Sequence, residues 1–168
     1  AIGITGKDGN LIEARPMDPD GIMGYVGEIV NINPQIVETI IENGYIPVVA
    51  PIGIDQEQAV YNINADLVAA AIAVKMNADK LVLLTDVPGL LKNPQDSNTL
   101  ISELKVSEVE GYVQQGVIAG GMVPKVRCCV EAVIGGVGRT HIIDGRVPHS
   151  ILLEIFTREG IGTMVVNG

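Results

Sequence analysis

Aromatic residues are scarce in this sequence: it has no tryptophan, four tyrosines and one phenylalanine among 168 residues. It also lacks any apolar run near the roughly 20 residues that a membrane-spanning helix requires. Basic residues are few, since 20 acidic side chains face 11 basic ones and the net charge is −9. Proteins that bind nucleic acid neutralise phosphates with clustered cations, and this chain has no such cluster. We therefore expect neither a membrane nor a nucleic acid as a partner.

Cysteine and histidine are equally sparse. The two cysteines, Cys128 and Cys129, are neighbours, which point in different directions on a helix and cannot easily form a disulfide. We interpret them as small buried hydrophobes in a reducing compartment. His141 and His149 have no cysteine or carboxylate at ligand spacing, so we interpret both as structural and expect no metal site. With no signal peptide visible, we predict a cytoplasmic protein.

The sequence has ample apolar residues, at 47%, interrupted by 20 glycines and 9 prolines. Apolar β-branched runs alternate with segments of helical periodicity, and Asp8-Gly9 predicts a hairpin turn between the first two strands. The pattern predicts an α/β protein with a mostly parallel central sheet between helix layers, a three-layer αβα sandwich. The expected strands are 1–5, 11–15, 25–32, 46–50 (buried), 80–85, 140–143 and 162–166, with 52–58 a polar connection; the expected helices are 34–42, 67–76, 107–115, 122–134 and 149–156.

A polar cluster precedes the helix expected at 67–76. Asn62, Asn64 and Asp66 occupy alternate positions there, and Asn64 or Asp66 could cap the helix. One residue is enough for a cap, so the cap does not explain the presence of Asn62. The cluster is either a turn with a cap or a set of side chains that face a ligand.

The segment that follows the strand at 80–85 is a second candidate, because open α/β sheets bind ligands beyond the carboxyl ends of their strands. Asp86 supplies a carboxylate, and Gly89 allows close approach of the backbone. This combination suits a sugar or the edge of a base, and a capped turn explains it equally well.

The glycine turn at 119–121 is the third candidate. It precedes a helix that carries Lys125 in its first turn, where backbone N–H groups and the helix dipole attract anions. A lysine at this position opposes the dipole, so phosphate binding is one explanation and a solvated surface side chain is the other. The spacing is not that of a P-loop. In the phosphate interpretation, Lys125 neutralises charge on a transferring phosphoryl group and Asp66 orients the cationic groups.

Four motifs occur in order along the chain: Tyr-Asn-Ile-Asn-Ala-Asp at 61–66, Leu-Leu-Thr-Asp-Val-Pro-Gly-Leu at 83–90, Gly-Gly-Met-Val-Pro-Lys-Val at 120–126 and Ile-Ile-Asp-Gly-Arg at 142–146. Together they resemble the N-acetylglutamate kinases of the amino acid kinase family, and the resemblance covers the whole chain. It implies ATP-dependent phosphorylation of the γ-carboxylate of N-acetyl-L-glutamate in arginine biosynthesis. It also implies that 1–60 belongs to the acetylglutamate lobe and 61–168 to the nucleotide lobe.

The resemblance assigns roles to particular residues. Asn62 and Asn64 would bind acetylglutamate, Asp66 would organise catalysis and Lys125 would stabilise the transition state. Magnesium would enter with ATP and bridge its phosphates. The ATP site would be lined by Thr85, Asp86, Val87, Gly89, Leu90, Leu91, Val117, Ile118, Ala119, Gly120, Gly121 and Met122.

The C-terminal run resembles the arginine-site signature of the feedback-inhibited kinases of this family. L-arginine would bind there as an inhibitor, although the pattern alone fits an amphipathic helix that ends in glycine turns. The residues concerned are His149, Leu152, Glu154, Phe156, Gly160 and Gly162.

The chain also departs from the family pattern. The N-terminal part of these kinases, with a first phosphate-binding lysine, two glycine turns and an arginine that grips the substrate carboxylate, has no counterpart here. We therefore expect this chain to hold half an active site and, alone, little or no activity. The resemblance implies a homo-oligomer, dimer or hexamer, and nothing predicts binding of the PII protein. The alternatives are another family member, such as carbamate kinase, aspartokinase or uridylate kinase, and a non-catalytic nucleotide- and arginine-binding module.

Overall fold

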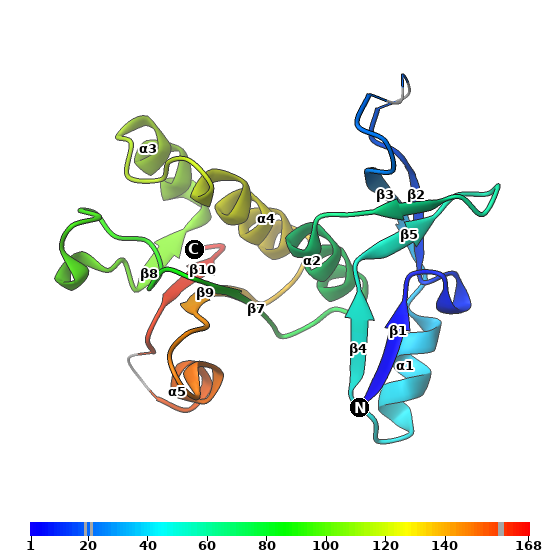
Figure 1. Ribbon diagram of the computed structural model, residues 1–168. Helices are drawn as coiled ribbons and strands as arrows, with labels where there is room; N and C mark the ends of the chain where they lie inside the picture. The colour runs from blue at the N-terminus through cyan, green and yellow to red at the C-terminus, as the bar shows by residue number, and fades with distance from the viewer. Residues whose placement is uncertain (19, 21, 158–159) are drawn as a thin grey trace. The chain divides into compact units, whose positions relative to one another are not determined.

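The computed structural model describes residues 1–18, 20, 22–157 and 160–168. The chain divides into two compact units, Ala1–Met76 and Asn77–Gly168, which appear in blue to green and in green to red (Figure 1). The change from one unit to the other falls after helix α2 (Ala65–Lys75). The assignment of 1–60 and 61–168 to different ligands stays a prediction.

Unit 1 holds two sheets. A parallel pair joins β1 (Ile2–Thr5) to β4 (Pro47–Ala50). The second sheet has the order β3-β2-β5-β6, with β2 parallel to β5 and the outer pairs antiparallel. Its strands are β2 (Ile12–Pro16), β3 (Gly27–Ile32), β5 (Ile52–Ile54) and β6 (Val60–Asn62), and the helices of the unit are the 3-10 turn η1 (Asp8–Asn10), α1 (Gln35–Glu42) and α2.

The predicted hairpin between the first two strands is wrong, because β1 pairs with β4 and β2 pairs with β3 and β5. The Asp8 carboxylate accepts hydrogen bonds from the Thr5 N–H and hydroxyl, at 2.7 and 3.0 Å, and closes a local turn. Gly6 then passes so close to β5 that a Cβ atom would lie 2.0 Å from the Ile52 carbonyl oxygen. The chain therefore enters a different sheet instead of folding back on β1.

Two further details of unit 1 differ from expectation. The strand expected at 46–50 forms, but Ile46 is 70% and Val48 57% exposed, so its predicted burial is wrong. The reason is that β4 belongs to a two-stranded sheet, so within the described ranges β1 covers one of its edges and no strand covers the other. Residues 52–58 are more than a polar connection, since β5 forms there and pairs with both β2 and β6. The core cluster of the unit draws residues from both sheets and both α-helices, among them Leu11, Ile12, Val37, Ile40, Ile63 and Val68.

Unit 2 is built on one sheet of order β7-β9-β10-β8, in which β7/β9 and β8/β10 are parallel and β9/β10 is antiparallel. The strands are β7 (Lys80–Thr85), β8 (Glu103–Lys105), β9 (Arg139–Asp144) and β10 (Thr163–Val166). The helices are η2 (Ser97–Thr99), η3 (Val106–Glu108), α3 (Val109–Gln114), α4 (Met122–Ile134) and α5 (Ser150–Phe156).

Helices α4 and α5 cover opposite faces of this sheet (Figure 1). Neighbouring residues of a strand point to opposite faces, and two such residues in β9 contact the two helices. The Thr140 hydroxyl donates to the Cys129 carbonyl of α4 at 3.5 Å, while His141 Nδ1 lies 2.6 Å from Glu154 Oε1 of α5. The predicted α/β class is confirmed, with a helix layer on each face in unit 2. Within the described ranges, no helix has the length and apolarity needed to cross a membrane.

Candidate functional site

The polar cluster of unit 1 is presented by β6 and the start of α2. Side chains alternate here: Tyr61 and Ile63 are buried, whereas Asn62 and Asn64 are exposed. The Asn62 N–H donates to the Tyr25 carbonyl at 2.8 Å and fixes the backbone. Both carboxamides therefore face outward from the same turn of chain.

Asn64 is the helix cap. Its Oδ1 accepts hydrogen bonds from the N–H groups of Asp66 and Leu67 at 2.9 and 3.2 Å. These are donors that the first turn of a helix leaves without an intrahelical partner. Asp66 follows in that turn, where the helix dipole favours a carboxylate. Because Asn64 supplies the cap, the Asn62 carboxamide is not needed for it. The Asn62 carboxamide makes no hydrogen bond to the part of the chain that the structure describes.

An apolar pocket of about 460 Å³ opens beside Asn62. Its walls are Tyr25, Ile52 and Val60, with Asn62 as the polar member. A pocket with apolar walls and one carboxamide suits a small ligand that carries a hydrocarbon group next to a polar one. The position of Asn62 at this pocket favours the ligand-facing interpretation of the cluster.

The β5–β6 hairpin that carries Asn62 is fixed by Asp55. Its two carboxylate oxygens accept hydrogen bonds from the Tyr61 hydroxyl and the Ala59 N–H, both at 2.8 Å. The hydrogen bond from Tyr61 holds the pKa of Asp55 below its usual value, and the same bond raises the pKa of Tyr61. Asp55 is therefore a structural carboxylate that orders the hairpin.

The carboxyl ends of β7 and β9 meet at one edge of the sheet in unit 2. Thr85 is in register with Asp144, and the Gly145 N–H donates to the Thr85 carbonyl at 2.8 Å. The exposed Asp86 follows directly, and the Thr85 hydroxyl donates to its Oδ1 at 3.3 Å. This edge is where an α/β sheet binds its ligand.

The loop after Asp86 is held against β10. The Leu90 N–H donates to the Thr163 hydroxyl at 2.8 Å, and Leu90 itself is buried. Gly89 has a φ of +140°, and a Cβ atom there would lie 2.7 Å from the Thr163 hydroxyl oxygen. Gly89 and Leu90 thus pack the predicted ATP loop against the sheet. The other predicted residues of this segment have exposed or half-buried side chains: Thr85, Asp86, Val87 and Leu91.

The glycine turn before α4 is built as a tight connection. Gly120 has a φ of +54°, and the N–H groups of Met122 and Val123 donate to the Ala119 and Gly120 carbonyls at 3.2 Å each. No side chain caps α4, whose N-cap is Gly121. Lys125 is half-buried in the first turn, Ile118 is fully buried, and Val117 is half-buried. The backbone from 119 to 121 is the exposed part of this segment.

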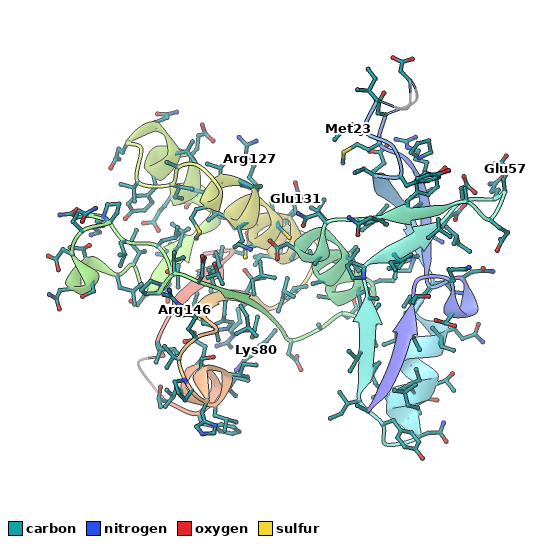
Figure 2. All side chains as sticks on the ribbon, viewed as in Figure 1. Met23, Glu57, Lys80, Arg127, Glu131 and Arg146 are labelled. Carbon is teal, nitrogen blue, oxygen red and sulfur yellow. The ribbon has the colours of Figure 1, made fainter. Side chains whose placement is uncertain are left out.

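Sequence reasoning gave no role to two residues at the same edge, Asp144 and Arg146. Arg146 Nε and Nη2 donate to the two carboxylate oxygens of Asp144, at 3.0 and 2.8 Å, and Figure 2 labels Arg146 beyond the end of β9. Hydrogen bonds from Arg146 lower the pKa of Asp144, and the carboxylates of Asp144 and Asp86 raise the pKa of Arg146. The signal was present in the sequence, because Asp144 directly follows the strand expected at 140–143, as Asp86 follows the strand expected at 80–85.

The C-terminal segment forms a second polar centre around Glu154, a buried residue of α5. Its Oε1 contacts His141 Nδ1, and its Oε2 accepts the N–H groups of Ile161 and Gly162 at 2.7 and 3.1 Å. Burial raises the pKa of Glu154, but the bonds from Ile161, His141 and Gly162 outweigh burial and lower it. Spacing along the sequence did not reveal Glu154 as the partner of His141, because α5 folds back across β9 to bring the two together.

The residues predicted for an arginine site only partly meet. Glu154, Gly160 and Gly162 lie together, since a Cβ atom on Gly160 would stand 2.8 Å from Glu154 Oε2. His149, Leu152 and Phe156 have exposed side chains and do not join them. His141 is the residue missed there, and its buried Nε2 has no hydrogen-bond partner within the described ranges. Across these ranges, no group of three or more His, Cys, Asp or Glu side chains is placed to hold a metal ion.

The Glu154 centre makes the stability of the fold depend on pH. Because the pKa of Glu154 is lowered in the folded state, its carboxylate stabilises the fold above the ordinary value of 4.5 and stops doing so as the pH falls through the lowered value. Glu154→Gln should reduce the free energy of unfolding by about 1–3 kcal/mol at pH 7. The difference from wild type should shrink as the pH falls towards 3. Urea unfolding at several pH values measures both.

The matched control is Glu131→Gln, an exposed carboxylate on α4 that Figure 2 labels. It should behave like wild type at every pH. A Glu154→Gln deficit that stays constant from pH 7 to pH 3 would contradict the assignment of this pH dependence to Glu154.

A sequence model of the amino acid kinase family matches residues 1–144. Acetylglutamate kinase of Syntrophomonas wolfei is 77% identical over 167 residues, which are 99% of this chain and 58% of that protein. Acetylglutamate kinase of Moorella thermoacetica is 60% identical over 179 residues, with coverage of 100% and 60%. The chain thus spans about three fifths of the length of these relatives.

Solved structures with similar folds include smu.665 from Streptococcus mutans, at 31% identity and a TM-score of 0.81, with 99% of this chain and 61% of that chain covered. N-acetylglutamate synthase from Neisseria gonorrhoeae, complexed with coenzyme A and L-arginine, is 30% identical with a TM-score of 0.84, and 98% and 38% are covered. Carbamate kinase from Giardia lamblia bound to AMP-PNP is 20% identical, with a TM-score of 0.68 and coverage of 100% and 62%, and shares the fold.

Proposed function

This chain belongs to the amino acid kinase family, and from that premise we propose that the protein transfers the γ-phosphoryl group of ATP to the γ-carboxylate of N-acetyl-L-glutamate. The product is N-acetyl-L-glutamyl 5-phosphate, and the reaction is a step of arginine biosynthesis. The names of the similar proteins from Syntrophomonas wolfei and Moorella thermoacetica support this choice within the family. The structural observation that carries it is the placement of Asn62 at the apolar pocket of unit 1.

Acetylglutamate has the chemistry that this pocket suits. Its acetyl methyl group would lie against Tyr25, Ile52 and Val60, and the Asn62 carboxamide would hydrogen-bond to the polar part of the ligand. The side-chain oxygen of Asn64 accepts the capping hydrogen bonds, and its NH₂ group would be available to the substrate. We propose that residues 1–60 contribute mainly to this acetylglutamate lobe.

The nucleotide lobe, residues 61–168, would bind ATP at the carboxyl edge of β7 and β9 and at the glycine turn before α4. Asp86 and its loop would face the adenosine, and the exposed backbone at 119–121 would approach the phosphates. Lys125 would neutralise charge on the transferring phosphoryl group, and Asp66 would orient the cationic groups around it. Magnesium would be held mainly by the phosphates of ATP, where it offsets their charge.

We further propose that L-arginine inhibits the enzyme by binding near Glu154. A guanidinium group hydrogen-bonds to a carboxylate, and the Glu154 carboxylate, with about four acceptor sites, keeps one beyond those used by His141, Ile161 and Gly162. The arginine bound to the Neisseria gonorrhoeae synthase, a similar fold, is consistent with such a ligand. The family resemblance also leads us to propose a cytoplasmic homo-oligomer, dimer or hexamer.

The kinase assignment can be tested in a chimera, in which this chain replaces the matching segment of the Syntrophomonas wolfei enzyme. The chimera should phosphorylate N-acetyl-L-glutamate and should be at least about 100-fold less active with carbamate or L-aspartate. Lys125→Ala and Asp66→Asn should lower kcat by about 100-fold or more, because each removes stabilisation of charge in the transition state. Coupled release of ADP measures all of these rates.

The control is Lys80→Ala, which removes an exposed lysine at the start of β7 and should leave the rate unchanged. A folded chimera that prefers carbamate or aspartate would identify another member of the family. An inactive chimera that still binds ATP would favour a non-catalytic nucleotide-binding module.

Arginine inhibition has its own test in the same chimera. L-arginine should inhibit it, and Glu154→Gln should raise the arginine concentration needed for half-inhibition by about tenfold or more, since a charged hydrogen bond is lost. Glu131→Gln serves again as the control and should leave inhibition as in wild type. Equal arginine sensitivity of the wild type and Glu154→Gln would exclude Glu154 from the arginine site.

A further inference from the structure

Unit 1 contains a second cavity, of about 510 Å³, that shares no lining residue with the pocket at Asn62. It is formed by strands β2 and β3, the β5–β6 turn and the last turn of α2, where Lys75 lies. Asn64 and Asp66 stand at the opposite end of the same helix. The cavity is therefore separate from the site proposed for acetylglutamate, and nothing in the proposed reaction uses it.

Two opposite charges line this cavity without meeting. Glu13 on β2 and Lys75 on α2 both contribute to its wall, yet neither forms an ion pair with any residue of the described ranges. Their charged atoms lie more than 4.0 Å apart. A carboxylate and an ammonium group that face one polar space can both be satisfied by a ligand that carries an ammonium group and a carboxylate.

The position of Glu13 is well fixed. It lies in the middle of the sheet, in register with Asn31 of β3 on one side and with Ile54 of β5 on the other. Its side chain is half-buried, so its charge is less well solvated than that of a surface residue. Lys75, by contrast, sits at the helix end on a flexible stem and can adjust to the ligand.

The other polar residues of the cavity differ in whether they are available. Asp55 is committed to Tyr61 and Ala59, so Glu13 is the carboxylate that remains for a ligand. Asn33 is likewise occupied, since its side chain donates to the Gly9 carbonyl and accepts from the Gln35 N–H. The carboxamides that remain belong to Asn10, Asn31, Gln56 and Gln58, and each offers both donors and an acceptor.

We propose that this cavity binds a free α-amino acid with a neutral polar side chain. The ligand ammonium group pairs with Glu13, its carboxylate pairs with Lys75, and its side chain bonds to the carboxamides of Asn31, Gln56 and Gln58. The cavity volume lies within the range typical of small-molecule sites. N-acetyl-L-glutamate does not fit this site, because it has no cation for Glu13 and carries two carboxylates.

Isothermal titration calorimetry on the chain tests this with L-glutamine, L-asparagine and L-serine as probes. At least one of them should bind, and for L-glutamine both N-acetyl-L-glutamine and L-glutaminamide should bind about tenfold more weakly or worse. The first analogue lacks the ammonium group and the second lacks the carboxylate. Failure of all three amino acids to bind would overturn the proposal.

Two variants assign the charges. Glu13→Gln should weaken binding of L-glutamine about tenfold but should not weaken binding of N-acetyl-L-glutamine further, because the partner of Glu13 is already absent there. Lys75→Gln should show the same relation with L-glutaminamide. Glu38→Gln on α1 and Lys80→Gln on β7 are exposed controls and should bind like wild type.

If a folded Glu13→Gln or Lys75→Gln variant binds L-glutamine as tightly as wild type does, the cavity is not the binding site and the proposal fails. The wild-type comparison of L-glutamine with its two analogues decides the matter even if a variant does not fold. The proposed kinase activity is not involved in any of these readouts.

Discussion

Unit 2 depends on the burial of strand β9 from both sides. Every residue from Thr140 to Asp144 is buried, which a strand achieves only when a helix covers each face and a strand lies along each edge. Thr140 reaches α4 and His141 reaches α5, so one strand fixes two helices. The parallel pairing with β7 then brings the ends of both strands, Thr85 and Asp144, to the same edge. The candidate nucleotide edge follows from this arrangement.

In unit 1 the corresponding constraint is the start of α2. A helix must satisfy the N–H groups of its first turn, and Asn64 does so with its side-chain oxygen. This frees Asn62, two residues earlier, to stand at the apolar pocket. The hairpin behind it is held by Asp55, so the carboxamide is presented by an ordered element. Of these two asparagines, Asn64 caps the helix and Asn62 faces the apolar pocket.

The sequence predicted the elements that depend on local signals. Glycine and proline boundaries and apolar periodicity placed β7, β9 and α4 within a residue or so, and Asn64, one of the two candidate caps, is the residue that caps α2. Contacts between residues far apart in the sequence could not be predicted from local patterns. The Asp8-Gly9 turn looked like a hairpin, but it leads β2 into another sheet.

The candidate sites show the same division. The polar cluster and the glycine turn were visible because their residues are close in sequence. The partner of His141 lies 13 residues away on another element, and so it could not be read from spacing. The hydrogen bond from Arg146 to Asp144 is local in sequence. Its place at the edge beside Thr85 becomes visible only from the pairing of β7 with β9. Residues that act across a fold become visible only when the register is known.

We propose that the carboxyl edge of unit 2 and the start of α4 bind ATP. The most direct measurement is calorimetric titration of the folded chain with magnesium-ATP, for wild type and for Lys125→Ala. We expect wild type to bind and Lys125→Ala to bind about tenfold more weakly or worse, since the substitution removes the positive charge that would contact the phosphates. A folded wild-type chain that does not bind ATP, or equal affinity in the two proteins, would contradict the account.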